Sequence, residues 1–548
     1  MTCPPAGMRL LPSREGPGAD LYRMKSICLP HTELPGTSAL FADYLYHYPR
    51  AARFYGHDPH DPSALKHAAT QVHLPDERRE ALVAALRKIN GESASLDLLE
   101  LPDTVAIVTG QQVGLFGGPI YSIYKALTAA RLARQLSDEG IRAVPVFWLA
   151  TEDHDFAEVD HCHVYDSRRR PVRLQMKARG AAGQPVGGME IVSAPLDALR
   201  GALHGLLYAD EVMALVEECY RPGRTLGEAF RLLLGRLLAG SGIVFFDPMQ
   251  PEVRALAAPL LRTAFERAED LSARLHDRNA ELRQAGYHAQ VLFEAHTSLF
   301  FKLENGRRLP LRRNGADYFH ESRKFTSAEL AANPEALSPS ALLRPVMQDY
   351  LLPTAAYVGG PAELAYLAQS QVLYQALLGR MPVAAPRSGF TLLDERARGL
   401  MDRHMVTLPG CFHGLEPLKE RIAADLVPSS LQVTFDQSQS EIRAVLDRLE
   451  RELGAFDPTL GAAMAKSKAK VLYQLEKNRR KAAREALRRD TIVTDGAEYL
   501  SHLVFPQRVL QERFYSVLPF LAQHGFDVLD TIEENIHPGC PGHMLLTV

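Results

Sequence analysis

The densest group of reactive side chains lies between residues 149 and 163, in the stretch LATEDHDFAEVDHCH. Carboxylates and an imidazole follow one another there, and these groups carry protons in general acid–base catalysis. The stretch directly follows VPVFWLA, an apolar run typical of a buried parallel strand. Ligands of open α/β sheets bind where such strands end. The candidate catalytic residues are Glu152, Asp153, His154 and Asp155, with Trp148 as a substrate contact.

A metal site is the alternative interpretation of the same stretch, because His161 and His163 could join the carboxylates as ligands. The alternative function would then be a metal-dependent amide hydrolase centred on residues 152–163. However, the HExxH pattern is absent, and the spacing matches no common zinc site. The sequence therefore favours acid–base chemistry, and no metal is expected.

A glycine-rich loop precedes this stretch, in AIVTGQQVGLFGGPIYSIYKAL, residues 106–127. It matches neither the dinucleotide fingerprint nor the P-loop, whose lysine follows the last glycine directly. What it offers is backbone N–H groups, two amides and a helix start that favours anions. We therefore expect the loop to bind a small polar substrate. The candidate contacts are Gln111, Gln112, Gly114, Tyr121 and Lys125.

A similar pattern recurs in RPVMQDYLLPTAAYVGGPAE, residues 344–363, where a strand, a Gly-Gly-Pro turn and a helix follow one another. Two arginines in RRLPLRR could act as carboxylate clamps, since guanidinium binds carboxylate through two hydrogen bonds. GYHAQV places a histidine at an expected strand start, where a structural role is at least as good an interpretation. The further candidate substrate contacts are His288, Arg312, Arg344, Gln348, Tyr357, Gly360 and Glu363.

The elements that must position these residues are predicted from hydrophobic pattern. Residues 104–110 and 142–150 are apolar runs typical of buried strands, and a helix is expected from Pro119 to about Ser137, with Gly140 just beyond its end. Strand, helix and strand in so short a span indicate a parallel βαβ unit. Further strands are expected in 240–248, 353–360 and 381–394, and Asn305-Gly306 predicts a hairpin.

The character of the chain changes near residue 400. Ile442, Leu446 and Leu453 belong to an apolar stripe on one long helix, and Asp457-Pro458 separates it from a second. Two such helices predict an antiparallel coiled-coil hairpin. We expect a core in 1–400 with insertions at about 160–240 and 295–345, an arm in 401–495, and a C-terminal segment, 496–548, that returns to the core.

The second helix of this arm is basic over residues 466–489, which leaves a nucleic-acid-binding protein as another alternative. No aromatic residues are interleaved with these charges, so a solvated or partner-facing helix is the preferred interpretation. The net charge of −3 gives no general reason to expect nucleic acid or a membrane as a partner.

Composition is that of a globular enzyme, with 46% hydrophobic and 23% charged residues in 548. No apolar run is long enough to span a bilayer, and the first residues lack the apolar region of a signal peptide. The six cysteines are scattered without a CxxC pair, which suits reduced thiols. The sequence therefore predicts a cytoplasmic protein.

Several long strings together resemble the BshC family, whose members are assigned as cysteine ligases of bacillithiol biosynthesis. They include VTGQQVGLFGGPIYSIYKALTAARLA, PVFWLATEDHDFAEVDH, LENGRRLPLRR and RPVMQDYLLPTAAYVGGPAELAYLAQ. The resemblance runs from about residue 34 to about residue 520. It implies a Rossmann-like, nucleotidyltransferase-like α/β core with a parallel sheet, connecting insertions, and an antiparallel coiled-coil arm that forms a homodimer.

The resemblance also implies an activity, the joining of L-cysteine to glucosaminyl-malate through an amide bond, with ATP as the candidate cosubstrate and ADP as a nucleotide that the family binds. His154 or Asp155 would deprotonate the cysteine ammonium, while Arg312 and Arg344 would hold the malate carboxylates. A nucleotide would lie apart from the main pocket. Its expected contacts are Pro386, Arg387, Ser388, Gln507, Arg508 and Gln511.

Overall fold

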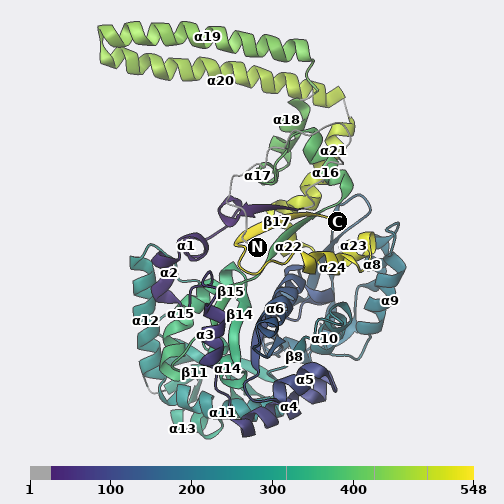
Figure 1. Ribbon diagram of the computed structural model, residues 1–548, viewed down its shortest axis with the longest axis vertical. Coiled ribbons are helices and arrows are strands. Elements are labelled where there is room, and N and C mark those ends of the chain that lie inside the picture. The colour runs from purple at the N-terminus through teal and green to yellow at the C-terminus, as the bar shows by residue number, and fades with distance from the viewer. Residues whose placement is uncertain (1–25, 316, 425, 490) are drawn as a thin grey trace.

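The computed structural model describes residues 26–548 apart from 316, 425 and 490, and shows an α/β body with a long helical arm extending from it (Figure 1). Five strands form a parallel sheet in the body, in the order β15–β14–β2–β3–β8. The chain therefore adds strands on one side of β2 and later returns to add strands on the other. These strands are β2 Val105–Gln111, β3 Ala143–Leu149, β8 Val244–Phe246, β14 Thr354–Gly359 and β15 Val383–Pro386.

Both faces of this sheet are covered, which explains why its strands are apolar without alternation. Val146 and Trp148 pack into one hydrophobic cluster, whereas Phe147 and Leu149 pack into another on the opposite face. The predicted βαβ unit is confirmed, since α6 Tyr121–Asp138 connects β2 and β3 and contacts both. Before β2 lie β1 Ser26–Pro30, α1 Ala39–Tyr46, α2 Tyr48–Ala51, α3 Ala64–Thr70, α4 Asp76–Asn90 and α5 Ala94–Glu100.

Between β3 and β8 the chain forms two small hairpin sheets and a helical layer. The hairpins pair β4 with β5 and β6 with β7, both antiparallel. The elements of this segment are α7 Phe156–Val159, β4 His161–Tyr165, β5 Pro171–Gln175, β6 Lys177–Arg179, β7 Glu190–Ser193, α8 Leu196–Leu203, α9 Ala209–Cys219 and α10 Leu226–Leu237.

Between β8 and β14 lies a second five-stranded sheet, in the order β12–β11–β10–β9–β13. The predicted hairpin at Asn305-Gly306 is confirmed, with φ of 52° and 72° at the two turn residues. Asparagine and glycine adopt such left-handed values most readily, which fixes the turn. The elements are α11 Pro251–Glu266, α12 Ala268–Gln284, β9 Thr297–Glu304, β10 Arg307–Asn314, β11 Asp317–His320, β12 Arg323–Phe325, α13 Ser327–Ala332, β13 Leu337–Pro339 and α14 Arg344–Leu351.

Residues 381–394 form two strands, where the sequence predicted one. β15 ends the parallel sheet at Pro386, and β16 Gly389–Leu393 begins a separate sheet after Arg387 and Ser388. In that three-stranded sheet β16 runs parallel to β17 Gly542–Thr547, which pairs antiparallel with β1. The sheet therefore brings both ends of the described chain together, and its strand β16 contacts α6 of the body. α15 Pro361–Leu377 lies between β14 and β15 in the chain.

The arm is an antiparallel pair of helices, α19 Ser429–Phe456 and α20 Pro458–Arg489, as the sequence predicted (Figure 1). Asp457 ends the first helix and accepts hydrogen bonds from Thr459 and Leu460 N–H at the start of the second. Part of the basic run is paired with acids, since Lys468 contacts Asp447 and Glu450. The side chains of Arg484, Arg488 and Arg489 lie outside the described residues.

The remaining helices precede and follow the arm in the chain: α16 Glu395–Arg403, α17 Leu408–Cys411, α18 Leu415–Ala424, α21 Thr491–Val504, α22 Gln511–Phe514, α23 Leu518–His524 and α24 Val528–Glu534. Of these, α23 contacts α9 and α24 contacts α6 in the body. Throughout the part of the chain that the structure describes, none of the helices combines the length and apolar character needed to cross a bilayer.

Candidate functional site

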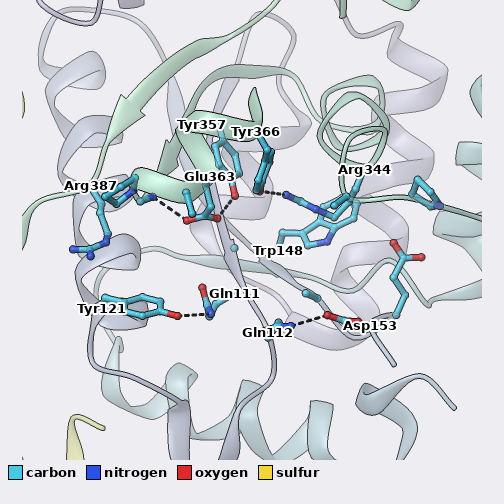
Figure 2. A pocket seen from close by; sticks show the side chains of 18 of the residues that line it. Gln111, Gln112, Tyr121, Trp148, Asp153, Arg344, Tyr357, Glu363, Tyr366 and Arg387 are labelled. Atoms are coloured by element: carbon cyan, nitrogen blue, oxygen red, sulfur yellow. Dashed lines mark hydrogen bonds between the residues drawn. The ribbon is translucent and has the colours of Figure 1, made fainter. Parts of the chain in front are cut away.

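A cavity of about 480 Å³ opens at the carboxyl ends of β2, β3 and β14, where the strand order reverses between β2 and β14 (Figure 2). This reversal is the point at which doubly wound sheets bind ligands. Most of the predicted substrate and catalytic residues meet here. Those that line the cavity are Gln111, Gln112, Tyr121, Trp148, Glu152, Asp153, His154, Arg344, Tyr357, Gly360 and Glu363, and they are joined by Arg387, which was predicted to contact a nucleotide.

The glycine-rich loop and the acidic loop face each other across this edge of the sheet. The side-chain amide of Gln112 donates to Asp153 at 2.7 Å and to Glu158 at 2.6 Å. Gln111 donates to the Tyr121 hydroxyl at 3.1 Å. Gln112 therefore joins the two loops, whereas Gln111 bonds to α6, the helix that follows its own loop. Figure 2 shows both glutamines between Tyr121 on one side and Asp153 on the other.

Lys125 lies beneath the cavity, on α6, and is fully buried. Its ammonium donates to the Gly110 carbonyl, to the Gln111 side chain at 3.1 Å and to Glu363 at 2.8 Å. Burial lowers the pKa of Lys125, and the Glu363 carboxylate acts against that shift. The residue does not line the cavity, so the prediction that it contacts substrate is wrong: its role is to tie the end of β2 to the start of α15.

Glu363 caps α15 and faces the cavity. Its carboxylate accepts the Gly360 N–H at 2.9 Å and the Tyr357 hydroxyl at 2.6 Å. Burial would raise the pKa of Glu363, but the Lys125 ammonium and the hydrogen bonds from Gly360 and Tyr357 together lower it below its usual value. Glu363 is therefore an ionised carboxylate whose hydrogen bonds fix the Gly-Gly-Pro turn.

Glu152 and Trp148 each present an unused polar atom at the cavity. One carboxylate oxygen of Glu152 accepts from Ser338 at 2.9 Å and lies 3.4 Å from Arg254. The other oxygen is buried and has no hydrogen-bond partner among the residues that the structure describes, and the same is true of the indole N–H of Trp148. Buried polar atoms are normally hydrogen-bonded, so these two are available for groups of a ligand.

His154 is held by Arg308. A guanidinium nitrogen of Arg308 lies 3.3 Å from His154 Nδ1, and guanidinium can only donate, so Nδ1 is the acceptor. Burial, with the Arg308 charge, lowers the pKa of His154 and keeps its ring neutral. The proton of the neutral ring is then on Nε2. His154 can donate a hydrogen bond into the cavity, but it is poorly arranged to take a proton there.

Arginines gather at the opposite side of the cavity, around Tyr121. Arg387 and Arg513 lie over the Tyr121 ring, with guanidinium carbons 5.3 and 5.8 Å from its centre. Arg387 also forms a buried ion pair with Glu512, with hydrogen bonds of 2.8 and 2.5 Å. That pair satisfies most of the Arg387 charge, which leaves the exposed Arg513 as the accessible cation.

Arg344 lies above the Trp148 ring, between these two sides. It donates to the Tyr366 hydroxyl at 2.9 Å and to Gln348 at 3.1 Å. Tyr366, Phe301, Arg308 and Arg513 all line the cavity and were not among the predicted residues. Of these four residues, only Tyr366 could have been predicted from the sequence. It follows Glu363 by three positions on one helix and so lies on the same helix face as this predicted contact.

Several predicted contacts lie elsewhere. The Asp155 carboxylate caps α7 by accepting the Ala157 N–H at 3.1 Å, and the side chain is outside the cavity. Gly114 is buried against Gly118, and Gln348 is fully buried behind Arg344. His288 is exposed in a loop and begins no strand. These corrections share a cause: local sequence shows neither the direction of a side chain nor the neighbour that takes up its hydrogen bonds.

Arg312 is also exposed, and Arg308 takes the place expected of it. By strict alternation residues 308, 310 and 312 would share one face of β10. The register shifts between Pro310 and Arg312, so the alternation is broken there. Arg308 donates to Ser338 at 2.8 Å and to the Pro339 carbonyl at 2.8 Å, which orients it toward His154.

The residues expected to bind a nucleotide are divided among three places. Arg387 lines the main cavity beside Pro386, and the N–H of Ser388 donates to Thr128. Gln511 is fully buried and bonded to the backbone of Leu392 and Leu503, so it is structural. Gln507 and Arg508 line a separate cavity of about 520 Å³ between α18 and α21.

The described residues contain no group of three or more side chains that could hold a metal ion. The Asp160 carboxylate accepts a hydrogen bond from His161 Nδ1 at 2.8 Å, while His163 stacks on Phe514. Burial lowers the pKa of His163 to about 4. The structure thus separates the ligands on which a metal-dependent hydrolase would depend.

Comparison with known proteins gives two family models that together match almost the whole chain. Residues 24–388 match the N-terminal Rossmann-like domain of the bacillithiol biosynthesis protein BshC, and residues 390–548 match its C-terminal coiled-coil domain. The chain belongs to the BshC family. The Rossmann-like sheet and the helical arm described above are the two parts that these BshC models name.

Curated relatives of this BshC chain carry one name, "Putative cysteine ligase BshC". The relative from Solibacter usitatus is 53% identical over 96% of this chain and 100% of its own length. The relatives from Koribacter versatilis and Salinibacter ruber are 35% and 32% identical, over 95% of this chain and 99% and 98% of theirs. These names support a ligase of bacillithiol biosynthesis.

Proposed function

We propose that this BshC chain joins L-cysteine to glucosaminyl-malate through an amide bond, in the cavity at the switch point of its sheet. The observation that carries the proposal is the division of the cavity into two chemically different sides. Arg513 and Arg387 beside Tyr121 suit an anionic substrate, whereas the open oxygen of Glu152 suits a cationic one. A malate derivative and an amino acid have these complementary charges.

In this arrangement the malate carboxylates bind on the arginine side and the cysteine ammonium hydrogen-bonds to Glu152. Amide formation needs the free amine, so a base must first remove a proton from the ammonium. Glu152 is the best base of the four predicted candidates, because His154 accepts from Arg308, Asp155 caps a helix, and Asp153 accepts from Gln112 and from the His154 N–H. The amine nitrogen of one substrate then attacks the carboxyl carbon of the other: the C–N bond forms, the C–O bond breaks, and the departing oxygen leaves with two protons as water.

Binding measured by calorimetry tests this assignment of sides. Arg513→Ala should weaken glucosaminyl-malate binding by about tenfold, the effect of losing one charged hydrogen bond, and leave cysteine binding nearly unchanged. Glu152→Gln should weaken cysteine binding and leave glucosaminyl-malate binding nearly unchanged. Arg168→Ala, at an exposed loop position, is the matched control. The division of the cavity would be contradicted if either variant, Arg513→Ala or Glu152→Gln, weakened the binding of both substrates. It would also be contradicted if either variant weakened the binding of neither substrate.

We further propose that a nucleotide occupies the cavity at Gln507 and Arg508. Its volume is within the range of small-molecule sites. Arg508 supplies a cation for phosphate, and Phe505 supplies an aromatic face for a base. Because this cavity is separate from the first, Arg508→Ala should abolish ADP binding while leaving cysteine binding unchanged, as measured by calorimetry.

We also propose that the arm forms a homodimer. Large apolar side chains on it are exposed in the single chain, including Val445 at 53%, Leu449 at 45% and Tyr473 at 60%. Val445 and Leu449 are one helical turn apart and share a face. A second copy of the arm would cover them, and exposed apolar surface of this kind commonly marks an interface.

A further inference from the structure

A second cavity, of about 690 Å³, opens at the same edge of the parallel sheet, beside the carboxyl ends of β3 and β8. Leu149 at the end of β3 and Thr151 in the acidic loop line it, whereas Ala150 and Glu152 line the main cavity. Among the described residues, the two cavities share no lining residue. The start of the acidic loop is therefore the wall between two separate cavities.

The walls of this second cavity are fixed by close backbone contacts. The Gly187 N–H donates to the Thr151 carbonyl at 3.0 Å, and a Cβ atom on Gly187 would lie 2.3 Å from the Thr151 Cβ. A Cβ atom on Gly227, in the first turn of α10, would lie 2.9 Å from the Gly187 carbonyl oxygen. The acidic loop, the segment before β7 and α10 are thus stacked without room for side chains between them. The cavity is formed before a ligand binds, as is usual for small-molecule sites.

Arg231 lies on α10 and presents a cation to this cavity. Among the residues that the structure describes, its guanidinium has neither a hydrogen-bond partner nor an ion-pair partner. Glu228 is one turn earlier on the same helix, but it is held in the helix cap, where one carboxylate oxygen accepts the Thr225 N–H at 2.9 Å and hydroxyl at 3.0 Å. Arg231 is therefore available to a ligand carboxylate, which guanidinium binds through two hydrogen bonds.

Asp247 directly follows β8 and presents a carboxylate to the same cavity. Its Oδ1 atom accepts the Thr151 hydroxyl at 2.5 Å and the Met249 N–H at 2.9 Å. Its Oδ2 atom accepts a hydrogen bond from none of the described residues. Burial raises the pKa of Asp247. An ammonium group at the open oxygen would favour the ionised carboxylate and so offset the cost of burying it.

The remaining charged side chains of this cavity already have partners. Lys88 is paired with Glu252, and Glu304 accepts from Lys302 at 2.6 Å. Arg307 donates to a backbone carbonyl at 2.9 Å. A ligand would therefore meet one open cation, one open anion and an apolar part of the wall. The apolar side chains are those of Ile89, Leu149, Met249 and Leu303.

We propose that this second cavity binds a free α-amino acid with an apolar side chain. The amino acid's carboxylate lies on the Arg231 guanidinium, its ammonium at the open oxygen of Asp247, and its side chain against the apolar wall. Arg231 and Asp247 attract each other without forming an ion pair, so a ligand with both charges fits between them. Asp247 would repel a simple anion, and Arg231 would repel a simple cation. The site is independent of the reaction proposed for the main cavity.

Calorimetry on the full-length protein with L-leucine tests this site, because L-leucine carries both charges and an apolar side chain. Arg231→Gln and Asp247→Asn should each weaken L-leucine binding about tenfold or more, the effect of losing one charged hydrogen bond. Asp247→Asn keeps an acceptor for the Thr151 hydroxyl, and Arg231 has no hydrogen bond to lose, so the thermal midpoints of both variants should stay close to that of the unchanged protein. Arg221→Gln, at an exposed position before α10, is the matched control.

Two analogues of L-leucine test the same division of charge in the unchanged protein. Isocaproate lacks the ammonium and isoamylamine lacks the carboxylate, so each should bind about tenfold or more weakly than L-leucine. Glu152→Gln, which alters the main cavity, should leave L-leucine binding unchanged. The proposal is overturned if L-leucine does not bind, if either analogue binds as tightly as L-leucine, or if Glu152→Gln removes L-leucine binding while Arg231→Gln and Asp247→Asn keep it.

Discussion

At the scale of single residues, the wall behind the cavity is a buried group of charges and rings. Arg387 and Glu512 are paired there with almost no exposure, and His543 lies next to them, fully buried. Burial would raise the pKa of Glu512, but the charge and hydrogen bonds of Arg387, with His543 and His31 acting in the same direction, lower it to about 2. Burial lowers the pKa of His543 to about 4, with the Arg387 charge acting in the same direction.

These shifts predict that the protein loses stability in mild acid. In the unfolded chain His543 titrates near 6.5, and in the folded chain it stays neutral down to about pH 4. The unfolded state therefore binds more protons between these values, so the stability is present above about pH 6.5 and is lost as the pH falls toward 4. Between about pH 7.5 and pH 5 the loss from His543 is about 2 kcal/mol.

The variant His543→Gln removes this titration and can keep a hydrogen bond to Thr391, which lies 2.9 Å from His543 Nε2. Its thermal midpoint, measured by calorimetry, should fall less between neutral pH and pH 5 than that of the unchanged protein. His60→Gln, at an exposed position, should retain the full pH dependence. An equal fall in all three proteins would contradict the assignment to His543.

At the scale of elements, the site depends on how closely β2 and β3 approach. A Cβ atom on Gly110 would lie 2.7 Å from the Trp148 carbonyl oxygen and 2.9 Å from the Trp148 Cβ. The two strands are in register at this point, with Gly110 opposite Trp148. The neighbouring Gln111 and Trp148 side chains line the cavity, so the absence of a side chain at Gly110 sets their spacing.

Gly110→Ala should therefore destabilise the protein by about 1–3 kcal/mol, the range for overpacking a core, and weaken substrate binding at the same time. Gly201→Ala is the matched control, because Gly201 lies within α8 with open space around it. That change should raise stability by up to about 1 kcal/mol through helix propensity. Thermal unfolding of both variants checks the prediction, which fails if Gly110→Ala is as stable as the unchanged chain.

Elements with a strong local pattern could be predicted from the sequence. The sequence correctly predicted β2, α6 and β3, because apolar runs and the glycine that ends a helix are local signals. It also predicted the hairpin at Asn305-Gly306. The sheet that pairs β1 with β17 could not be predicted from the sequence, because these two strands lie at opposite ends of the chain. For the same reason Arg308 and Arg513 were missed, since the cavity receives them from segments far from β2 and β3.

At the scale of the whole molecule, the arm extends from the body and presents apolar residues to solvent (Figure 1). The helices α19 and α20 pack closely at their joined end, where a Cβ atom on Gly461 would lie 2.8 Å from the Gly454 Cα. Their mutual contact leaves Val445 and Leu449 uncovered. The proposed homodimer is the arrangement that covers them.

Replacing both Val445 and Leu449 with Glu should convert the dimer into a monomer, because charges would then face the partner across an apolar contact. Light scattering coupled to size-exclusion chromatography measures the mass directly. Leu207→Glu, which alters a leucine 75% exposed on the body, should leave the dimer intact. A dimer that survives the double substitution on the arm would show that the interface lies elsewhere.

The central claim is that the switch-point cavity is where bacillithiol is assembled. Bacillithiol and glucosaminyl-malate should be quantified in a producing bacterium that lacks its own BshC and carries this chain. The unchanged chain should restore the thiol. Gln112→Ala, which breaks the contact between the two loops, should lower it about tenfold or more, accumulate glucosaminyl-malate and leave ADP binding intact. Normal bacillithiol in the strain without any BshC, or with Gln112→Ala, would contradict the account.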